Sequence, residues 1–327
     1  MKILLPLILL TLATAVAPAD EPTAKVVIAV GAGGTEDYRQ VFTDAATEWE
    51  KAAEEGGAET VTIGIDGNGN GEEDLKALEE AIAGNAETPT PLWIALIGHG
   101  TFDGREAKFN LRGEDVTARK LASWLDKVER PVAIINATAS SAPFIKAVSK
   151  ENRIVVTATK SASEDSFARF GQFIAAAIGD PEADVDRDGT TSLLEAFLKA
   201  SEDVAEFYEK EGRIATEQAL IDDNGDGFGT PASWFRGVRA VKTAKDGAAP
   251  DGNHAHQLHL NPGEEERNLP PEIRKQRDAL EAELFALRAK KEEMGEDKYY
   301  KEFEQIARAL AELYCLVESP SDKVETE

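Results

Sequence analysis

The chain has 327 residues, of which 61 are acidic and 36 are basic, so its net charge at neutral pH is −25. A field of that sign repels phosphate backbones, which argues against nucleic acid as a partner. Its single cysteine excludes an internal disulfide framework, and its length suits one large domain with an appendage.

Residues 1–19 have the composition of a secretory signal peptide. Lys2 supplies a positive start, a short apolar stretch follows, and Ala17 and Ala19 are small residues suited to cleavage. The stretch is shorter than the about 20 apolar residues that a membrane-spanning helix needs. We expect cleavage after Ala17 or Ala19, export to the periplasm or the extracellular space, and no stable membrane insertion. A buried N-terminal helix is the alternative.

Five short apolar runs alternate with helical patterns across residues 24–240, which we expect to form the main domain. The runs cover residues 25–30, 60–65, 92–97, 132–136 and 154–158. Nearly continuous apolar strands, separated by helical segments, are typical of a mainly parallel sheet with helices on both faces. The predicted fold class is therefore a three-layer α/β/α sandwich.

The composition changes after residue 240. Residues 241–270 are rich in Gly, Pro, Asn, Asp and Glu, which predicts a linker. Residues 271–317 carry apolar residues at helical spacing on both sides of a turn at 294–297, which predicts an αα-hairpin. We expect this hairpin to dock on the main domain or to self-associate. Cys315 lies in it and is expected to be a buried, inert thiol, with an intermolecular disulfide as the alternative.

Two of the predicted strands end in side chains that could carry chemistry. His99 stands between two glycines after the strand at 92–97, and the polar segment 136–141 follows the strand at 132–136. Ligands of parallel α/β sheets bind outside the carboxyl ends of the strands, and a loop histidine can serve as a general base. The two segments therefore predict a candidate site. A histidine satisfied by local hydrogen bonds is the alternative.

These strand ends, Ile97-Gly98-His99-Gly100 and Asn136-Ala137-Thr138-Ala139-Ser140, resemble those of the caspase and legumain clan of cysteine peptidases. In that clan, His-Gly ends one strand and an Asp-x-Cys-x-Ser-Gly-like segment ends the next. The resemblance covers roughly residues 25–229 and implies a caspase-like sandwich. It places His99 as the general base, the Gly100 amide in the oxyanion hole and Thr138 where the family has its cysteine.

The missing cysteine changes the expected mechanism. A Thr hydroxyl is branched at Cβ and needs strong activation by a base, whereas a Cys is partly thiolate near neutral pH. The substitution favours a pseudopeptidase that binds a peptide or protein partner, whose identity the sequence does not give. One alternative is a hydrolase that uses His99 with Thr138 or Ser140, and another is a calcium-dependent structural protein of the envelope.

Residues 184–195 match the calcium-binding loop of an EF-hand. A calcium ion takes six to eight oxygen ligands, and Gly189 at position 6 permits the sharp turn of such a loop. The expected ligands are Asp184, Asp186, Asp188, the carbonyl of Thr190 and the bidentate carboxylate of Glu195. We expect a structural Ca²⁺ at this loop. An Asx turn that caps the following helix without an ion is the alternative.

A second Asp/Asn-rich segment begins at Asp222. It supplies positions 1, 3, 5 and 6 of the same pattern, but position 12 is Ser233. Without a bidentate Glu, an Asp/Asn/Gly turn is favoured over a metal site. The same argument applies to residues 66–71.

Overall fold

The computed structural model describes residues 22–65, 71–84, 88–291 and 293–317. The predicted signal peptide at 1–19 and most of the turn at 66–71 lie outside these ranges. No helix within them is both long and apolar enough to cross a membrane.

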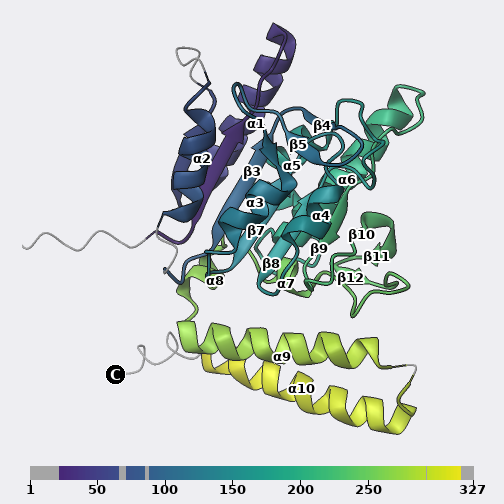
Figure 1. The fold of residues 1–327 in the computed structure, drawn as a ribbon. Coiled ribbons are helices and arrows are strands. Elements are labelled where there is room, and N and C mark those ends of the chain that lie inside the picture. Colours follow the sequence, from purple (N-terminus) through teal and green to yellow (C-terminus); the bar gives the residue numbers. More distant parts are fainter. Residues whose placement is uncertain (1–21, 66–70, 85–87, 292, 318–327) are drawn as a thin grey trace, which may run out of the picture.

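A seven-stranded sheet with the order β10-β9-β8-β7-β3-β1-β2 forms the centre of the molecule (Figure 1). Five strands pair in parallel: β1 (Lys25–Val30), β2 (Glu59–Ile63), β3 (Leu92–Ile97), β7 (Val132–Asn136) and β8 (Arg153–Thr157). The last two, β9 (Leu220–Asp222) and β10 (Thr230–Pro231), are antiparallel to their neighbours. The prediction of a mainly parallel sheet built from these five runs is confirmed.

Helices cover both faces of the sheet. Successive residues of a strand point to opposite faces, and in β1 the side chains of Val26 and Ile28 join one core while Val27 and Ala29 join the other. The first core includes α1 (Glu36–Glu55), α5 (Phe170–Ala177) and α6 (Leu193–Lys210). The second includes α2 (Asp74–Ala83), α3 (Ala118–Leu125) and α4 (Pro143–Val148). The molecule therefore has the predicted three-layer α/β/α architecture.

Shorter elements lie in the connections between the main strands and helices. Directly after β3, a three-stranded antiparallel sheet is formed by β4 (Gly100–Phe102), β5 (Ala107–Phe109) and β6 (Val116–Thr117). A small hairpin consists of β11 (Phe235–Arg236) and β12 (Arg239–Ala240). Two 3₁₀ turns, η1 (Pro181–Ala183) and η2 (Ala232–Trp234), precede the acidic loop and β11 respectively.

The segment expected to be a linker is partly packed on the sheet domain. It contains the short helices α7 (Asn253–His256) and α8 (Glu264–Asn268). Ala255 and Leu260 are buried in the core formed with α1, α5 and α6. The amide of Leu193 also donates to the carbonyl of Leu258 at 2.9 Å. The α/β domain thus draws part of its core from residues beyond 250.

The predicted C-terminal hairpin is present as α9 (Pro271–Ala289) and α10 (Glu296–Val317), which run side by side below the α/β domain (Figure 1). Arg277 in α9 forms an ion pair with Glu266 in α8, and Gln257 Nε2 donates to the carbonyl of Asp278 at 2.9 Å. These polar contacts tie the hairpin to the segment that precedes it. The side chain of Cys315 is outside the described part of the chain.

Candidate functional site

The two strand ends singled out by the sequence meet at one edge of the sheet. β3 and β7 are neighbours, with Leu96 paired to Asn136. Gly100, the first residue of β4, packs directly against the segment after β7. A Cβ at this position would lie 2.5 Å from Thr138 Oγ1 and 2.2 Å from the carbonyl oxygen of Ala139. Only a glycine allows the two segments to approach so closely.

The imidazole of His99 lies in a cluster of aromatic rings. The ring centroids of Tyr38 and Phe42, both in α1, are 4.8 Å and 5.2 Å from it, and that of Phe167 is 6.0 Å away. All three contacts are edge-on, which is a favourable geometry for such rings. Within the described residues, the imidazole makes no hydrogen bond that would orient it as a base.

The Thr138 hydroxyl is turned back onto its own loop. The residue is 0% exposed, and its Oγ1 donates to Asn136 Oδ1 at 2.7 Å. The Thr138 amide donates to the same oxygen at 3.2 Å. No hydrogen bond joins Thr138 to His99 in the described chain, although the two segments are adjacent. A hydroxyl held in this way neither faces solvent nor has a base as its acceptor.

The hydroxyls of the two serines that follow are also buried and hydrogen-bonded. Ser140 is 1% exposed, and its Oγ donates to the carbonyl of Ala162 at 2.8 Å. Its φ is +52°, the left-handed region that a residue with a side chain seldom adopts. Ser141 is fully buried, and its Oγ pairs with Thr159 Oγ1 at 3.1 Å. The segment therefore presents no hydroxyl to a substrate in solution.

Little space remains between these segments and α1. The cavity there, bordered by Phe42, Gly98, Ala137 and Phe167, has a volume of about 10 Å³. That is about the room that one water molecule needs. A larger cavity of about 300 Å³ lies farther along the same edge, beyond the end of β8, between α5 and α6. It is lined by Ala158, Lys160, Phe170, Val204, Glu217 and Ala205, among others.

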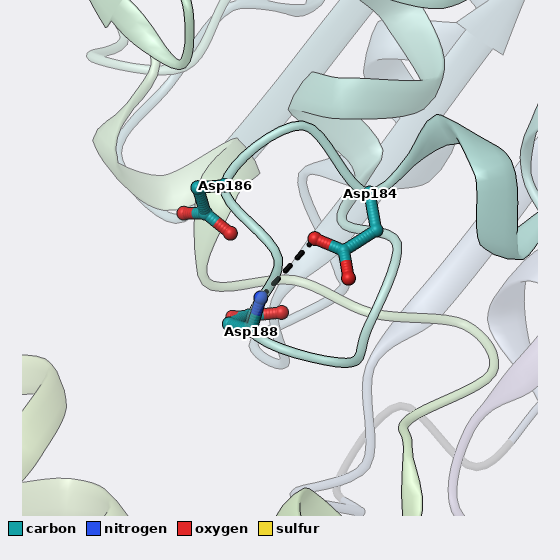
Figure 2. Close-up of side chains that lie close together, drawn as sticks. All are labelled: Asp184, Asp186 and Asp188. Carbon is teal, nitrogen blue, oxygen red and sulfur yellow. Dashed lines mark hydrogen bonds between the residues drawn. The ribbon is translucent and has the colours of Figure 1, made fainter.

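The acidic loop between η1 and α6 brings three carboxylates together (Figure 2). One oxygen each of Asp184, Asp186 and Asp188 lies within 4.8 Å of the others, the one such group of three among the described residues. Asp184 Oδ1 also accepts from the Asp188 amide at 3.2 Å, and its Oδ2 accepts from the Gly189 amide at 2.9 Å. These bonds fold the loop around the first aspartate.

The surroundings of two of these carboxylates shift their pKa values in opposite directions. Burial, followed by repulsion from Asp186, raises the pKa of Asp188 to about 6. The pKa of Asp186 is lowered, chiefly because its carboxylate forms a 2.8 Å hydrogen bond with His256 Nε2 in α7. The loop thus carries concentrated negative charge, with His256 hydrogen-bonded to it and His259 close enough to act on Asp186.

The carboxylate of Glu195, another expected ligand, does not belong to this group of three. Glu195 is 1% exposed; its Oε1 accepts from the Val185 amide at 2.8 Å and its Oε2 from the Ser192 hydroxyl at 2.7 Å. Glu195 Oε2 also accepts from the Ser192 amide at 2.9 Å, and Ser192 Oγ accepts from the Glu195 amide at 3.2 Å; these two bonds form a capping box at the start of α6. Thr190 Oγ1 accepts from the Gly263 amide at 3.1 Å. The Ser-x-x-Glu spacing was the sequence signal for this cap.

The segment at Asp222 forms turns. Asp222 accepts from the amides of Gly225 and Gly227 at 3.1 Å and 2.9 Å, and Asn224 Oδ1 accepts from the Asp226 amide at 2.8 Å. Such side-chain to backbone bonds are those of Asx turns.

Sequence reasoning missed a buried carboxyl pair beside this turn. Asp223 and Asp251 are 3% and 2% exposed, and the Asp223 amide donates to Asp251 Oδ1 at 3.1 Å. Burial, followed by repulsion from Asp223, raises the pKa of Asp251 to about 8. Asp223 accepts from the amides of Gly252 and Ala255, each at 2.9 Å, at the start of α7. The pair joins the end of β9 to the segment beyond 250.

No family model and no curated protein matches the chain. Among solved structures, the fold is similar to the initiator caspase Dronc of Drosophila, at 18% identity and a TM-score of 0.43, over 63% of this chain and 81% of that one. It is similar to caspase-1 of Spodoptera frugiperda at 10% identity and a TM-score of 0.38, over 62% and 86%. A protein of Geobacter sulfurreducens matches at 9% identity and a TM-score of 0.37, over 55% and 89%. Similarity at this level carries no activity, substrate or site residue across to this chain.

Proposed function

We propose that this chain is an exported pseudopeptidase of caspase-like fold, which acts by binding a peptide or protein partner and is stabilised by calcium. The observation that carries the proposal is the Thr138 hydroxyl. It lies beside the His-Gly segment, yet it is buried and donates to Asn136. Nucleophilic catalysis needs the nucleophile within hydrogen-bond reach of its base, with the base oriented by a third group.

The cavities near the strand-end site support a role in binding a partner and not in cleaving a substrate. Thr138 is 0% exposed, so a scissile bond cannot reach its hydroxyl from solvent, and the nearby cavity beside α1 has a volume of only about 10 Å³. The cavity of about 300 Å³ beyond β8 is of the size that ligand sites have. It combines apolar walls from Phe170 and Val204 with the charged groups of Lys160 and Glu217. We assign partner binding to this cavity.

The calcium part of the proposal rests on the three converging aspartates. Like charges within 4.8 Å repel one another, and a divalent cation between them would remove that repulsion. In the structure the Glu195 carboxylate accepts hydrogen bonds from the Val185 amide and from Ser192. Its side chain must therefore move before it can bind an ion with both oxygens. Asp184, Asp186 and Asp188 would hold the ion, and the ion would fix the start of α6.

A peptide library displayed on phage tests the binding function. We expect the wild type to enrich a family of sequences and Ala205→Trp, which fills the cavity beyond β8, to lose that enrichment. Ala289→Trp, an exposed helical position in the hairpin, is the matched control and should enrich the same family.

The selected peptides then separate binding from catalysis. They should remain intact after prolonged incubation with the wild type and with Thr138→Cys, because the side chain at position 138 faces Asn136. Cleavage by the wild type that Thr138→Ala abolishes would establish the rival hydrolase and refute the proposed function.

A further inference from the structure

Two buried cations share a cavity at the edge of the sheet opposite His99, where the strands begin. Lys25 is the first residue of β1, and Arg130 stands two residues before β7. They are 7% and 5% exposed. The cavity has a volume of about 260 Å³, and the hydroxyl-bearing Thr88 and Thr90 also line it.

The hydrogen bonds of the two cations are incomplete. Arg130 donates through Nη1 to Thr88 Oγ1 at 3.0 Å and through Nη2 to the carbonyl of Gly84 at 3.3 Å. Its Nε is buried without a partner. In the described part of the chain, no side-chain hydrogen bond or ion pair engages the Lys25 ammonium. Unpaired charged donors inside a protein are costly, so the geometry calls for an acceptor.

The charges around the cavity favour an anion. The exposed carboxylate of Glu59, which is paired with Lys25 in the sheet register, is the acid that acts on both cations. Two positive charges against one negative leave a net +1, in a molecule whose total is −25. Burial and the neighbouring Arg130 lower the pKa of Lys25, which reflects the cost of holding two cations together. An anion between them would offset that cost.

We propose that this cavity binds a small oxyanion, which is held by the positive charges of Lys25 and Arg130. The same chemistry has two sources: a free phosphate, or a carboxylate of the chain itself. Pro22, the first described residue, lines the cavity, and Asp20 and Glu21 precede it directly in the sequence. The site is independent of the proposed peptide binding.

Thermal unfolding of the full chain in sodium phosphate, at an ionic strength held constant with sodium chloride, tests the proposal. Phosphate that binds the folded state raises the Tm with a saturable dependence on its concentration. We expect the apparent affinity to fall at least tenfold in Lys25→Met and in Arg130→Met. Lys127→Met removes an exposed lysine near Arg130 and should leave the affinity unchanged.

A further variant keeps the test decisive if the methionine variants do not fold. Glu59→Gln removes the competing carboxylate at an exposed position, so phosphate should bind several-fold more tightly. An unchanged affinity in this variant, or an equal rise in Tm in the wild type and Lys25→Met, would show that phosphate acts elsewhere and would overturn the proposal.

The source of the oxyanion is decided by a second chain with Asp20→Asn and Glu21→Gln. A rise in the Tm of the wild type with phosphate identifies a free oxyanion as the occupant. A response confined to the double variant identifies the chain's own carboxylates as the occupants. The absence of any response in both chains would contradict the site.

Discussion

At the residue scale, the candidate site is decided by where one hydroxyl points. The resemblance seen in the sequence aligns Thr138 with the nucleophile of the caspase clan, and in the structure Thr138 lies beside Gly100. Its rotamer, however, was not predictable from the sequence. Asn136, two residues earlier, supplies a carboxamide oxygen that takes both the hydroxyl and the amide of Thr138. A local acceptor of this kind is favoured over a distant base because little chain has to be ordered to reach it.

The Thr138 hydrogen bond should be measurable as stability. Thr138→Val keeps the shape of the side chain but removes the donor, which leaves Asn136 Oδ1 with one bond fewer. We expect a loss of about 1 kcal/mol in the free energy of unfolding by urea. Thr101→Val removes an exposed threonine bond to Asn110 and should cost less. Equal effects of the two substitutions would argue against a specific role for the buried bond.

The buried carboxyl pair predicts a pH dependence. The pKa of Asp251 is about 8 in the folded protein, above the ordinary value of 3.8, so the folded state holds this proton more tightly than the unfolded chain does. Its stabilising contribution is complete below about pH 4 and is lost as the pH rises towards 8. We expect the free energy of unfolding to fall less steeply with pH in Asp251→Asn than in the wild type. Parallel curves for the two proteins would refute this assignment.

At the scale of elements, the sequence predicted what periodicity can encode. The five parallel strands are nearly continuous apolar runs because both of their faces are buried, and their boundaries were found within one or two residues. The strands β4, β5, β6, β9 and β10 have only two or three residues each, too few to show a period. The expected linker lacks such a period too, although Ala255 and Leu260 reach the core.

Glu195 shows a second limit of sequence patterns. Its position fits both an EF-hand ligand and the acidic member of a capping box, so the sequence pattern alone does not separate the two roles. In the structure its oxygens accept hydrogen bonds from the Val185 amide and from Ser192. Ser192→Ala should therefore destabilise the protein by about 1 kcal/mol, the usual value of an N-cap. Chemical unfolding with and without calcium would measure this loss of stability. An unchanged unfolding midpoint would contradict the capping role of Ser192.

The acidic loop predicts a response to calcium that separates the ion from the cap. Calcium should raise the Tm of the wild type and of Ser192→Ala, while Asp188→Asn should bind at least tenfold more weakly. The affinity should also fall as the pH is lowered through about 6, because a proton on Asp188 competes with the ion. Calorimetry would measure both effects. A Tm that is the same in calcium and in chelator would eliminate the calcium proposal.

At the scale of the whole molecule, the hairpin is the separable part. Its contacts to the preceding segment include the ion pair of Arg277 with Glu266 and the bond of Gln257 to Asp278. A chain that ends at residue 270 keeps the sheet and both cores, so we expect it to unfold cooperatively with a Tm within a few degrees of the full chain. Aggregation or loss of the cooperative transition would show that the hairpin is integral to the fold.

The same truncation tests self-association, which we also propose for the hairpin. Tyr300 and Tyr314 of α10 are 54% and 48% exposed, an apolar surface that a second copy could cover. Sedimentation equilibrium should give a mass above that of a monomer for the full chain and a monomer for the truncated one. Equal masses for the two chains would remove the hairpin as the contact.

The central claim is that no hydroxyl at the ends of β3 and β7 acts as a nucleophile. Intact-mass spectrometry after incubation with an excess of a fluorophosphonate probe measures this directly. The structure predicts no added mass on the folded wild type, because Thr138, Ser140 and Ser141 are buried and hydrogen-bonded. A stoichiometric adduct that Thr138→Ala or Ser140→Ala abolishes would contradict the account.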